Sequence, residues 1–436
     1  SVLVVEKDPE VYPLPRAAHF DHEIMRLFQQ LGVTEAVSQH ARPAPAYEFR
    51  AADGRVLMRM EGSAGGSPSG WRASYMFHQP GLEHALRAKV AADPKVETRI
   101  GVRFTGYIED AEGVVATLEG PGGRQTVRAR FLVGCDGGSS AVRAALGGGL
   151  FDYGFDEPWL VIDVRVNEGA RVPDVNLQIC DPARPTTCVL MGPGRHRWEF
   201  MLLPGETAEQ VLADDFILPL VAAWDCGDIE IERRAVYRFH GLVANRWRQG
   251  RVILAGDSAH QTPPFAGQGM CAGLRDAANL AWKLAAVLEG ADPALLDTYQ
   301  SEREPHVRAF IELAIGMGRL VCTLDPEAAA ARDAAMTGPG PKPPLPSFSP
   351  PPLGPGCLLP GSPAAGTLFF QPWADDRGLD DVLGAGPWLI GRADLNAARL
   401  APYRAALSDW LEKQGAEAVL VDRKSTRLNS SHRMPS

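Results

Sequence analysis

The amino-acid sequence predicts an α/β protein in which a Rossmann-like domain with a parallel sheet is split around an antiparallel-sheet domain. Residues 2–6, VLVVE, form a continuous apolar run that is typical of a parallel strand buried on both faces. Two later apolar runs, at 131–133 and 252–255, each lead into an aspartate beside glycine. Between them, from about residue 155 to residue 245, the pattern changes to short strands, which indicates an inserted antiparallel sheet.

These patterns set the domain boundaries that we expect. Residues 1–154 and 246–337 form the split domain, and residues 155–245 form the inserted one. Prolines and glycines crowd residues 338–356, and because proline lacks the backbone donor and fixes its own torsion, we expect a linker there. Residues 357–421 again carry strand and helix patterns, which predict the beginning of a further small domain, cut off before completion.

Three helices are predicted in the split domain. Asp21 is placed to cap a helix that ends at Gly32. A second helix begins after Gln79 with Pro80 in its first turn, where the missing proline donor costs nothing. A third helix follows residues 263–270, and its predicted inward face carries Leu274, Ala277, Ala281, Leu284 and Leu288.

Composition excludes several classes of partner. The chain has 436 residues, 45% of them hydrophobic, and a net charge of −9, so it has cores to bury and no basic surface for nucleic acid or an acidic membrane. No apolar run is long enough to span a membrane, and no signal peptide is present. Its seven cysteines form no CxxC pair and no metal-ligand spacing, which favours a reduced, cytoplasmic setting without a metal site. We expect a small-molecule partner.

Three acids follow strands at positions where a nucleotide cofactor needs them. Glu6 closes the first strand, and an acid there accepts hydrogen bonds from the vicinal hydroxyls of a ribose. Glu6 alone is more often an ordinary surface acid. Asp136 in GCDG and Asp257 in AGDS strengthen the prediction, because each can hold a ribose or ribityl hydroxyl while the adjacent Gly137 or Gly256 lets the backbone approach a phosphate.

The loop PPFAGQGM, residues 263–270, leads directly into the third predicted helix. Its glycines allow backbone amides to point outward at the helix N-terminus, where the macrodipole favours negative charge. A reduced flavin carries its anionic charge near N1 and the C2 oxygen. The loop is therefore predicted to hold an electron-rich flavin ring.

These motifs resemble those of the class A FAD-dependent aromatic hydroxylases, the para-hydroxybenzoate hydroxylase group. The shared features are an acid that ends the second strand, a D-G motif after a meander, and a G-D motif before P-P-x-x-G-Q-G. The stretches PRAAHFDHEIMRLFQQLG, MFHQPGLEHALR, RWEFMLLPGE and NRWRQGRVILAGDSAH most resemble the branch of 3-(3-hydroxyphenyl)propionate hydroxylase. The likeness covers about residues 1–421. It implies a split FAD-binding domain, an inserted substrate domain and a truncated thioredoxin-like domain at the C-terminus.

The resemblance also implies contacts with the cofactors FAD and NADH or NADPH. Glu6 would bind the adenosine ribose, Arg16 would lie near the flavin or pyridine nucleotide, and Gln79 would touch the ribityl chain. Backbone around the isoalloxazine ring would come from Pro264, Gly267, Gln268, Gly269 and Met270.

The two glycine–aspartate motifs complete the implied cofactor site. Asp136, Gly137 and Arg143 match the motif implicated in binding both FAD and the reduced nicotinamide cofactor. Gly256 and Asp257 would lie at the ribityl or pyrophosphate region.

The implied activity is hydroxylation of a phenolic aromatic acid such as 3-(3-hydroxyphenyl)propionate, using NAD(P)H and O2 through a flavin C4a-hydroperoxide. No catalytic residue is assignable: His78 and His260 lie in the motifs, but a lone histidine is more often structural. Arg197 either meets a substrate carboxylate, contacts flavin, or is an exposed arginine at a strand end. Two alternatives stay open, a flavoprotein of this fold with a nonphenolic substrate, such as an epoxidase or reductase, and an inert flavin-binding fragment.

Both ends of the sequence depart from the expected pattern. The first ten residues, SVLVVEKDPE, already form a strand, so we expect the chain to begin at the second strand of the split domain, without a G-x-G-x-x-G turn. Because that turn supplies backbone donors to the pyrophosphate, its absence predicts weak retention of FAD. Residues 422–436 are polar, aperiodic and similar to translated adapter DNA, so we exclude them from the fold as an artefactual tail; the alternative is a natural flexible tail.

Overall fold

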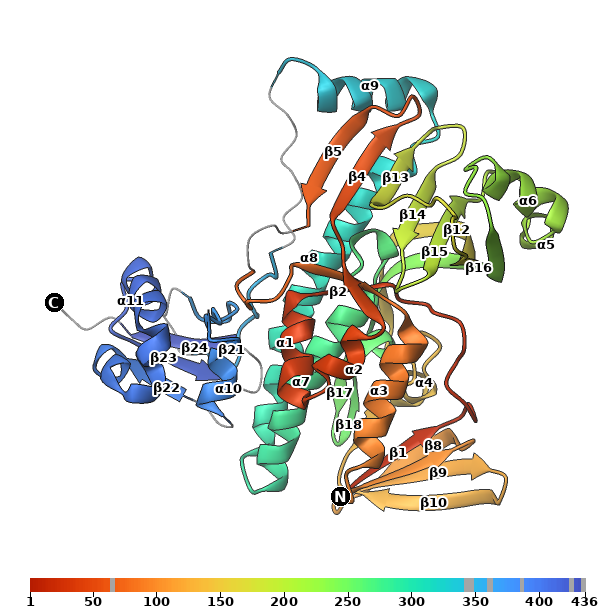
Figure 1. The fold of residues 1–436 in the computed structure, drawn as a ribbon. Helices are drawn as coiled ribbons and strands as arrows, with labels where there is room; N and C mark the ends of the chain where they lie inside the picture. The colour runs from red at the N-terminus through yellow and green to blue at the C-terminus, as the bar shows by residue number, and fades with distance from the viewer. Residues whose placement is uncertain (63–66, 341–348, 359–363, 385–387, 423–426, 433–436) are drawn as a thin grey trace.

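The computed structural model describes residues 1–436 except 63–66, 341–348, 359–363, 385–387, 423–426 and 433–436. Small sheets form the base of the molecule, long helices fill its middle, and one large sheet lies above them (Figure 1). A separate C-terminal domain lies beside the middle helices. The chain is α/β, as the sequence predicts.

The base contains the first strand and the two strands that lead into the glycine–aspartate motifs. β1 (Val2–Glu6) pairs in parallel with β7 (Val96–Ile100). The antiparallel meander consists of β8 (Arg103–Glu109), β9 (Val114–Gly120) and β10 (Gly123–Ala129). A third sheet contains β11 (Leu132–Gly134), β18 (Val252–Leu254) and β17 (Arg248–Gln249). Because β11 and β18 are parallel, the loops that follow them leave the same edge of the sheet.

The predicted helix limits are confirmed in α1 (His22–Leu31). The side chain of Asp21 accepts hydrogen bonds from two first-turn amides, and Gly32 ends the helix with φ of 68°. The other helices are α2 (Thr34–Ser38), α3 (Gln79–Ala91), α4 (Ala141–Leu146), α7 (Gly269–Leu288), α8 (Thr298–Val321) and α9 (Pro326–Thr337), with 3-10 turns η1 (Gly256–Ser258), η2 (Pro264–Ala266) and η3 (Pro293–Asp297). The short strands β2 (His19–Asp21), β3 (Ala41–Pro43) and β6 (Ser74–Phe77) form a small sheet beside α1.

The predicted inward face of α7 is wrong. Ala277, Ala281 and Leu288 are exposed, whereas Arg275 and Asp276 are buried. The buried face also contains Cys271, Ala272, Asn279, Leu280, Lys283 and Val287. Ion pairs neutralise the buried charges, so a pattern of apolar residues alone points to a different side of the helix.

The large sheet has eight strands in the order β19-β16-β12-β15-β14-β13-β4-β5. Six of them are β12 (Leu150–Val166), β13 (Asn176–Cys180), β14 (Thr186–Leu190), β15 (Arg195–Met201), β16 (Ile229–Ala244) and β19 (His260–Gln261). The other two, β4 (Ala46–Ala51) and β5 (Val56–Glu61), come from the N-terminal part of the chain, so this sheet draws on more of the sequence than residues 155–245.

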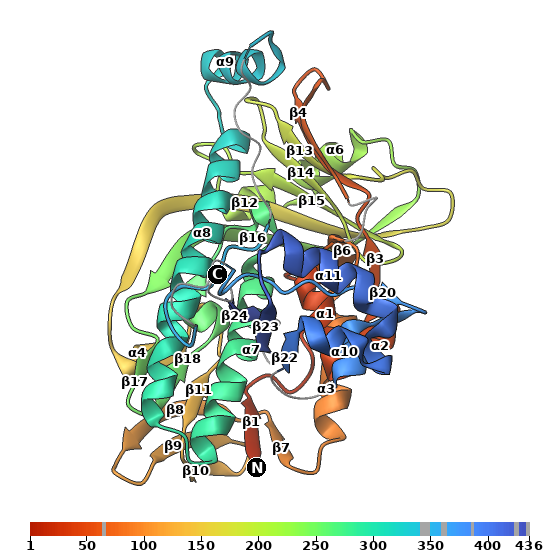
Figure 2. The same ribbon diagram turned by 90° about the vertical axis from the view of Figure 1, so that its left-hand side faces the viewer.

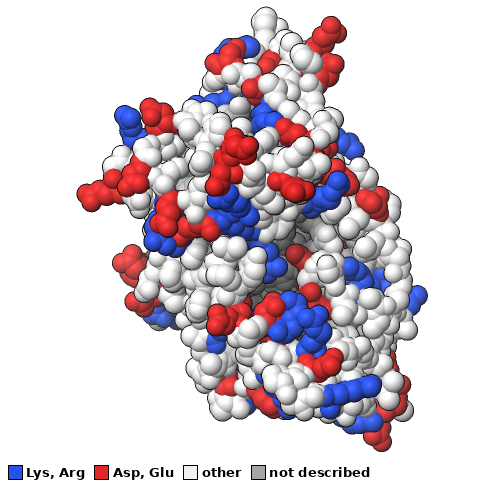
Figure 3. All heavy atoms as spheres, turned by 90° about the vertical axis from the view of Figure 1, so that its right-hand side faces the viewer, with Lys and Arg blue, Asp and Glu red and all other residues white. Residues whose placement is uncertain are grey.

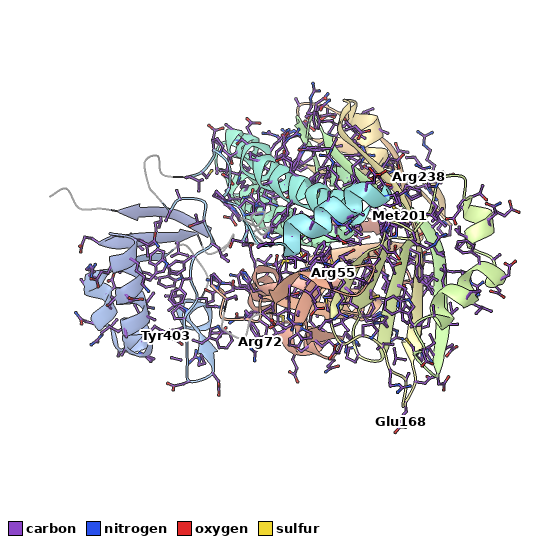
Figure 4. All side chains as sticks on the ribbon, turned by 90° about the horizontal axis from the view of Figure 1, so that it is seen from above. Arg55, Arg72, Glu168, Met201, Arg238 and Tyr403 are labelled. Carbon is purple, nitrogen blue, oxygen red and sulfur yellow. The ribbon has the colours of Figure 1, made fainter. Side chains whose placement is uncertain are left out.

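The two faces of this sheet have different partners. One face packs beneath α5 (Ala208–Val211) and α6 (Asp214–Ala222) through an apolar cluster that includes Leu160 and Trp198. The opposite face carries Trp159 and Met201 and packs against Phe265 and α8. Seen from above, Met201 lies in the body of the protein while Glu168 projects from its periphery (Figure 4). The second face is therefore the one directed toward the glycine loops.

The C-terminal domain packs against the helical layer (Figure 2). Arg26 of α1 forms two hydrogen bonds of 2.7 Å to the carboxylate of Asp380, and both side chains are at least nine-tenths buried. The elements are β20 (Trp373–Ala374), β21 (Arg377–Gly378), α10 (Leu379–Leu383), β22 (Trp388–Gly391), η4 (Arg392–Asn396), η5 (Ala398–Tyr403), α11 (Arg404–Lys413), β23 (Ala418–Asp422) and β24 (Arg427–His432). β24 lies within the segment 422–436 that the sequence led us to exclude, and its backbone pairs with β23.

The segment predicted as a linker, 338–356, lies partly outside the described residues. Its described C-terminal part follows α8 closely. The amide of Gly354 donates to the carbonyl of Glu302 at 2.9 Å, and Ser301 donates to the carbonyl of Pro355 at 2.6 Å. These contacts fix the path of the chain between α8 and the C-terminal domain.

Candidate functional site

The loops after β11 and β18 are joined by one arginine. Arg143 of α4 donates through Nη1 to the carbonyl of Ser258 at 2.8 Å and through Nη2 to that of Gly138 at 2.5 Å. The hydroxyl of Ser258 also donates to the carbonyl of Gly134 at 2.6 Å. Arg143 therefore holds the two predicted cofactor loops together, which is a positioning role that its sequence motif does not reveal.

Asp136 is used within its own loop. One carboxylate oxygen accepts from the hydroxyl of Ser140, and the other accepts from the amide of Val142 at 3.0 Å. Both contacts stabilise the start of α4: the amide of Val142 is a donor that the first helical turn leaves unpaired, and Ser140 is the N-cap residue. The neighbouring Gly137 has φ of 79°, and an added Cβ there would meet no atom within 4 Å. The backbone is thus open on this side of the loop.

The loop at Gly256 is held from behind by Asp276 of α7, a residue that the sequence did not single out. Asp276 Oδ2 accepts from the amide of Gly256 at 3.0 Å and from His260 Nε2 at 2.6 Å. Its other oxygen accepts from Arg303 Nε at 2.8 Å. Burial alone would raise the pKa of Asp276, but His260 and Arg303 outweigh it, so the pKa lies below its ordinary value. His260 is accordingly a buried partner of Asp276 that helps to hold this loop.

The side chain of Gln268 is hydrogen-bonded to the N-cap residue of α1 and to a residue of α7. Its amide nitrogen donates to Asp21 at 3.2 Å, and its oxygen accepts from Arg275 Nη1 at 2.9 Å. Arg275 in turn pairs with Asp21 and, at 2.6 Å, with Glu23. Opposite charge outweighs the cost of burial and keeps the pKa of Asp21 below its ordinary value. This network connects the loop to α1 and fixes its shape.

The N-terminus of α7 has features that suit an electron-rich group. No side chain caps the helix, and its first turn contains no acidic residue. Gly267 has φ of 62°, and an added Cβ would lie 2.7 Å from the imidazole of His19. By contrast, an added Cβ at Gly269 would meet its nearest neighbour at 3.9 Å. Pro264 and Met270 are partly buried, and Gly269 leaves the backbone beside Met270 uncovered by a side chain.

Asp257 belongs to the 3-10 turn η1 that follows β18. Its side chain is exposed, yet surrounding protein displaces solvating water and raises the pKa of the carboxyl group above its ordinary value. Cys135 on the adjacent loop is also exposed, and the same cause raises its pKa to about 11. Figure 3 shows a hollow with charged residues at its margin on one face of the molecule.

The segment after β1 is tied to α3. Gln79 Oε1 accepts from the amides of Arg16 and Ala17 at 2.7 and 2.8 Å, so this side chain holds the segment in place. Glu6 is half-buried at the end of β1, and Arg16 is exposed with its guanidinium 5.6 Å from the ring centre of Tyr12. A cavity of about 520 Å³ lies between this segment and the first turns of α3, lined by Pro9, Glu10, Val11, Pro13, Pro80, His84 and Arg87.

Arg197 is neither exposed nor at a strand end, contrary to one of the roles considered from sequence. It lies within β15, 4% exposed, and pairs with Asp163 at 2.5 Å. Its remaining donors reach the carbonyls of Arg16 at 2.9 Å and Pro15 at 2.5 Å. Arg233 of β16 also donates to the carbonyl of Pro15. The two arginines therefore secure the segment that carries Arg16 onto the large sheet.

A row of polar side chains crosses the loop-facing side of the sheet, and the sequence analysis missed it. Gln178, Thr187 and Glu199 are register neighbours on β13, β14 and β15, and each is less than 9% exposed. Thr187 donates to Gln178 at 2.7 Å, Gln178 donates to Tyr47 Oη at 2.5 Å, and Tyr47 donates to the carbonyl of Phe265 at 3.0 Å. Alternate polar residues on strands are the signal that locates such a row.

The fold agrees with that of known FAD-dependent hydroxylases. The family description "FAD binding domain" matches residues 1–314. The chain belongs to this family of FAD-dependent aromatic hydroxylases.

A relative from Rhodococcus jostii named probable NADH-specific resorcinol 4-hydroxylase is 44% identical over 77% of this chain, and the match spans 64% of that relative's length. A 3-(3-hydroxy-phenyl)propionate/3-hydroxycinnamic acid hydroxylase from Mycolicibacterium smegmatis is 36% identical over 98% of this chain and 78% of its own length. The solved structure of aklavinone-11 hydroxylase with FAD and aklavinone has a TM-score of 0.78 and 26% identity, covering 100% of this chain and 91% of that one. The flavin-dependent monooxygenase PieE, at 22% identity and a TM-score of 0.79, shares the fold.

The residues of this member of the family fit FAD. The uncapped N-terminus of α7 and the open backbone at Gly137 suit electron-rich oxygen atoms, and the exposed carboxylate of Asp257 suits hydroxyl donors. In the described part of the chain, no three His, Cys, Asp or Glu side chains cluster as a metal site. No helix there combines the length and apolar character that crossing a membrane requires.

Proposed function

We propose that the protein is a flavoprotein monooxygenase that hydroxylates a phenolic ring. The overall reaction converts one aromatic C–H bond, O2, NAD(P)H and a proton into a phenolic C–OH, water and NAD(P)⁺. The observation that carries the proposal is the position of the glycine loop at 263–270, with Phe265 hydrogen-bonded to Tyr47 on the polar face of the sheet. A flavin ring at that loop would face a buried polar surface, as an aromatic hydroxylase requires.

FAD, when bound, would supply the redox chemistry between the nicotinamide cofactor and O2. The chain's own residues bind and orient. We propose that Asp257 holds hydroxyl groups of the ribityl or pyrophosphate region, with Gly256 giving the backbone room to approach. Asp136, Gly137 and Arg143 shape the neighbouring loop for FAD and the nicotinamide cofactor.

The other end of FAD would lie along the first strand. Glu6 would accept hydrogen bonds from the adenosine ribose. Gln79 would act by fixing the segment that carries Arg16, since its side-chain oxygen is already used by two backbone amides. Pro264, Gly267, Gly269 and Met270 would provide backbone around the flavin ring, and Gln268 would stabilise that loop from behind.

The substrate class is proposed from the polar row together with the relatives' names. Resorcinol and 3-(3-hydroxyphenyl)propionate are both phenols, and a phenolic hydroxyl suits a surface of buried acceptors. Burial of the ring beside the polar row would exclude water from the reacting carbon. This proposal includes O2 as co-substrate.

A substrate-stimulated oxidation assay tests the proposal. Protein saturated with FAD is mixed with NADH or NADPH in air, and the loss of absorbance is measured with and without a panel of phenols. We expect faster oxidation with at least one phenol and a hydroxylated product in equal amount. Oxidation that no phenol accelerates, or that yields only hydrogen peroxide, would exclude a phenol hydroxylase and favour a nonphenolic substrate.

A further inference from the structure

We propose that Glu199 is the residue that accepts the proton of the substrate's phenolic hydroxyl. This inference rests on the proposed function, because it assigns a proton acceptor to the phenol site. Glu199 lies within β15 between Trp198 and Phe200, in the stretch RWEFMLLPGE, and the sequence analysis assigned it no role. The assignment comes from where the sheet places its carboxylate and from which donors around it are already used.

The sheet places Glu199 on the face directed toward the glycine loop. It is the register partner of Thr187 on β14 and of Val161 on β12, and register partners share a face. Two positions further along β15, Met201 lies on this same face and packs in one core cluster with Phe265. Glu199 therefore belongs to the row of polar side chains that ends at the loop.

The carboxylate of Glu199 has no hydrogen-bond donor among the described residues. Thr187 directs its only hydroxyl proton to Gln178 at 2.7 Å, away from Glu199. Arg197 Nη1 is 3.7 Å from Glu199 Oε1, too far for a hydrogen bond, because the guanidinium is held by Asp163 and the carbonyl of Pro15.

A buried carboxylate with an open acceptor is unusual in a folded protein. The large majority of buried polar side-chain atoms have a hydrogen-bond partner. Glu199 is 6% exposed, and its side chain retains 8% of its accessible surface, so a small opening reaches the carboxylate. A phenolic O–H provides the missing donor.

The charges around Glu199 suit a group that gains and loses a proton. Burial raises the pKa of Glu199; Arg197 and Arg233 oppose that rise, and Asp163 adds to it. The titratable Tyr47 lies close enough for the charge of Glu199 to affect it. Arg197 and Arg233 lie in one buried cluster with Asp163 and Glu199, so the arginines compensate the negative charge that Glu199 carries as a base.

The proton transfer balances without another reagent. As the ring carbon forms its bond to oxygen, the phenolic O–H bond breaks, its electron pair moves into the ring, and the proton bonds to Glu199 Oε. When the hydroxylated ring loses its C–H proton to solvent and becomes aromatic again, Glu199 returns its proton to the same phenolic oxygen. Glu199 is thus regenerated in each cycle.

The test compares Glu199→Gln with Glu230→Gln, an exposed glutamate of the same sheet. Glutamine keeps the shape and an acceptor oxygen but takes no proton. With FAD-saturated protein and resorcinol as the probe, we expect kcat of E199Q to fall by about 10²–10⁴, the usual contribution of a general base, while KM changes less than tenfold. Wild-type kcat should fall in acid as Glu199 is protonated, and E199Q should lack that fall. The control should behave as wild type.

A binding measurement on the wild type requires no variant. Isothermal titration calorimetry compares resorcinol with its dimethyl ether, which has no O–H donor. We expect resorcinol to bind about tenfold to a hundredfold more tightly at neutral pH, the range for a hydrogen bond to a charged group, and the preference to shrink as Glu199 is protonated.

The results separate the two proposals. If phenols are hydroxylated but E199Q matches wild type in kcat and pH profile, Glu199 is only a structural counter-charge and the inference is wrong. If no phenol is hydroxylated, the proposed function fails, and the calorimetric preference still decides whether Glu199 receives a hydroxyl donor. Equal binding of resorcinol and its dimethyl ether would overturn the assignment.

Discussion

Replacing Asp276 by asparagine should destabilise the protein more than any exposed aspartate replacement. Asp276 is 0% exposed and accepts from Gly256, His260 and Arg303. Asparagine keeps the shape but has one acceptor oxygen and no charge, so the 1% exposed guanidinium of Arg303 loses its counter-charge.

The magnitude follows from the burial of this pair. Removing one partner of a buried ion pair costs about 3–5 kcal/mol, because the remaining charge is left without compensation. An exposed pair contributes about 0–1 kcal/mol. Asp297 provides the matched control, because it pairs with Arg248 at 2.5 Å while 73% of its side chain is exposed.

Urea unfolding of Asp276→Asn and Asp297→Asn, followed by tryptophan fluorescence, measures both losses. Trp247 lies 5.2 Å from the imidazole of His260, ring centre to ring centre, and reports on this region. The depressed pKa of Asp276 means that its stabilisation is present above the ordinary carboxyl pKa of about 3.9 and is lost as pH falls below it through the folded-state value. Wild type and D276N should therefore differ at neutral pH and converge in acid.

This prediction would be contradicted if D276N lost less than about 1 kcal/mol of unfolding free energy, or no more than D297N does. Arg303 would then not depend on the negative charge of Asp276. A difference that persists unchanged into strong acid would also contradict it. In that case the difference in stability would come from packing and not from the charge of the Asp276 carboxylate.

Asp257→Ala should weaken FAD binding about tenfold to a hundredfold through loss of a charge-assisted hydrogen bond, and an unchanged titration with FAD would remove Asp257 from the site. Gly269→Val should alter the flavin spectrum while leaving the melting temperature near wild type, because an added Cβ there has 3.9 Å of room. Gly267→Ala should lower the melting temperature as well, since its φ of 62° and the nearby imidazole both oppose a side chain; equal effects of the two variants would refute this distinction. Arg26→Ala should release the C-terminal domain from α1 and speed limited proteolysis between them, and an unchanged cleavage rate would show that Asp380 is not a principal anchor.

The sequence alone determined the features that depend only on residues close together in the chain. Asp21 caps α1 and Gly32 ends it, because capping and left-handed backbone are local properties. The strands predicted at 131–133 and 252–255 lie within one residue of β11 and β18, and parallel pairing then brings the loops after them to one edge. The prediction that these loops bind FAD rested on their glycines and acids together with their resemblance to a known family.

Only the tertiary structure decided which charged residues are buried and what they do. Asp276 meets Arg303 across two helices, and Arg197 meets Asp163 across two strands, so the pattern of either segment by itself describes these residues as surface charges. The open acceptor of Glu199 depends on Thr187 directing its proton elsewhere. Burying a charge is costly unless a partner compensates it, and the partner here comes from a different part of the chain. Sequence periodicity records local environment, whereas this compensation exists only after the elements have packed together.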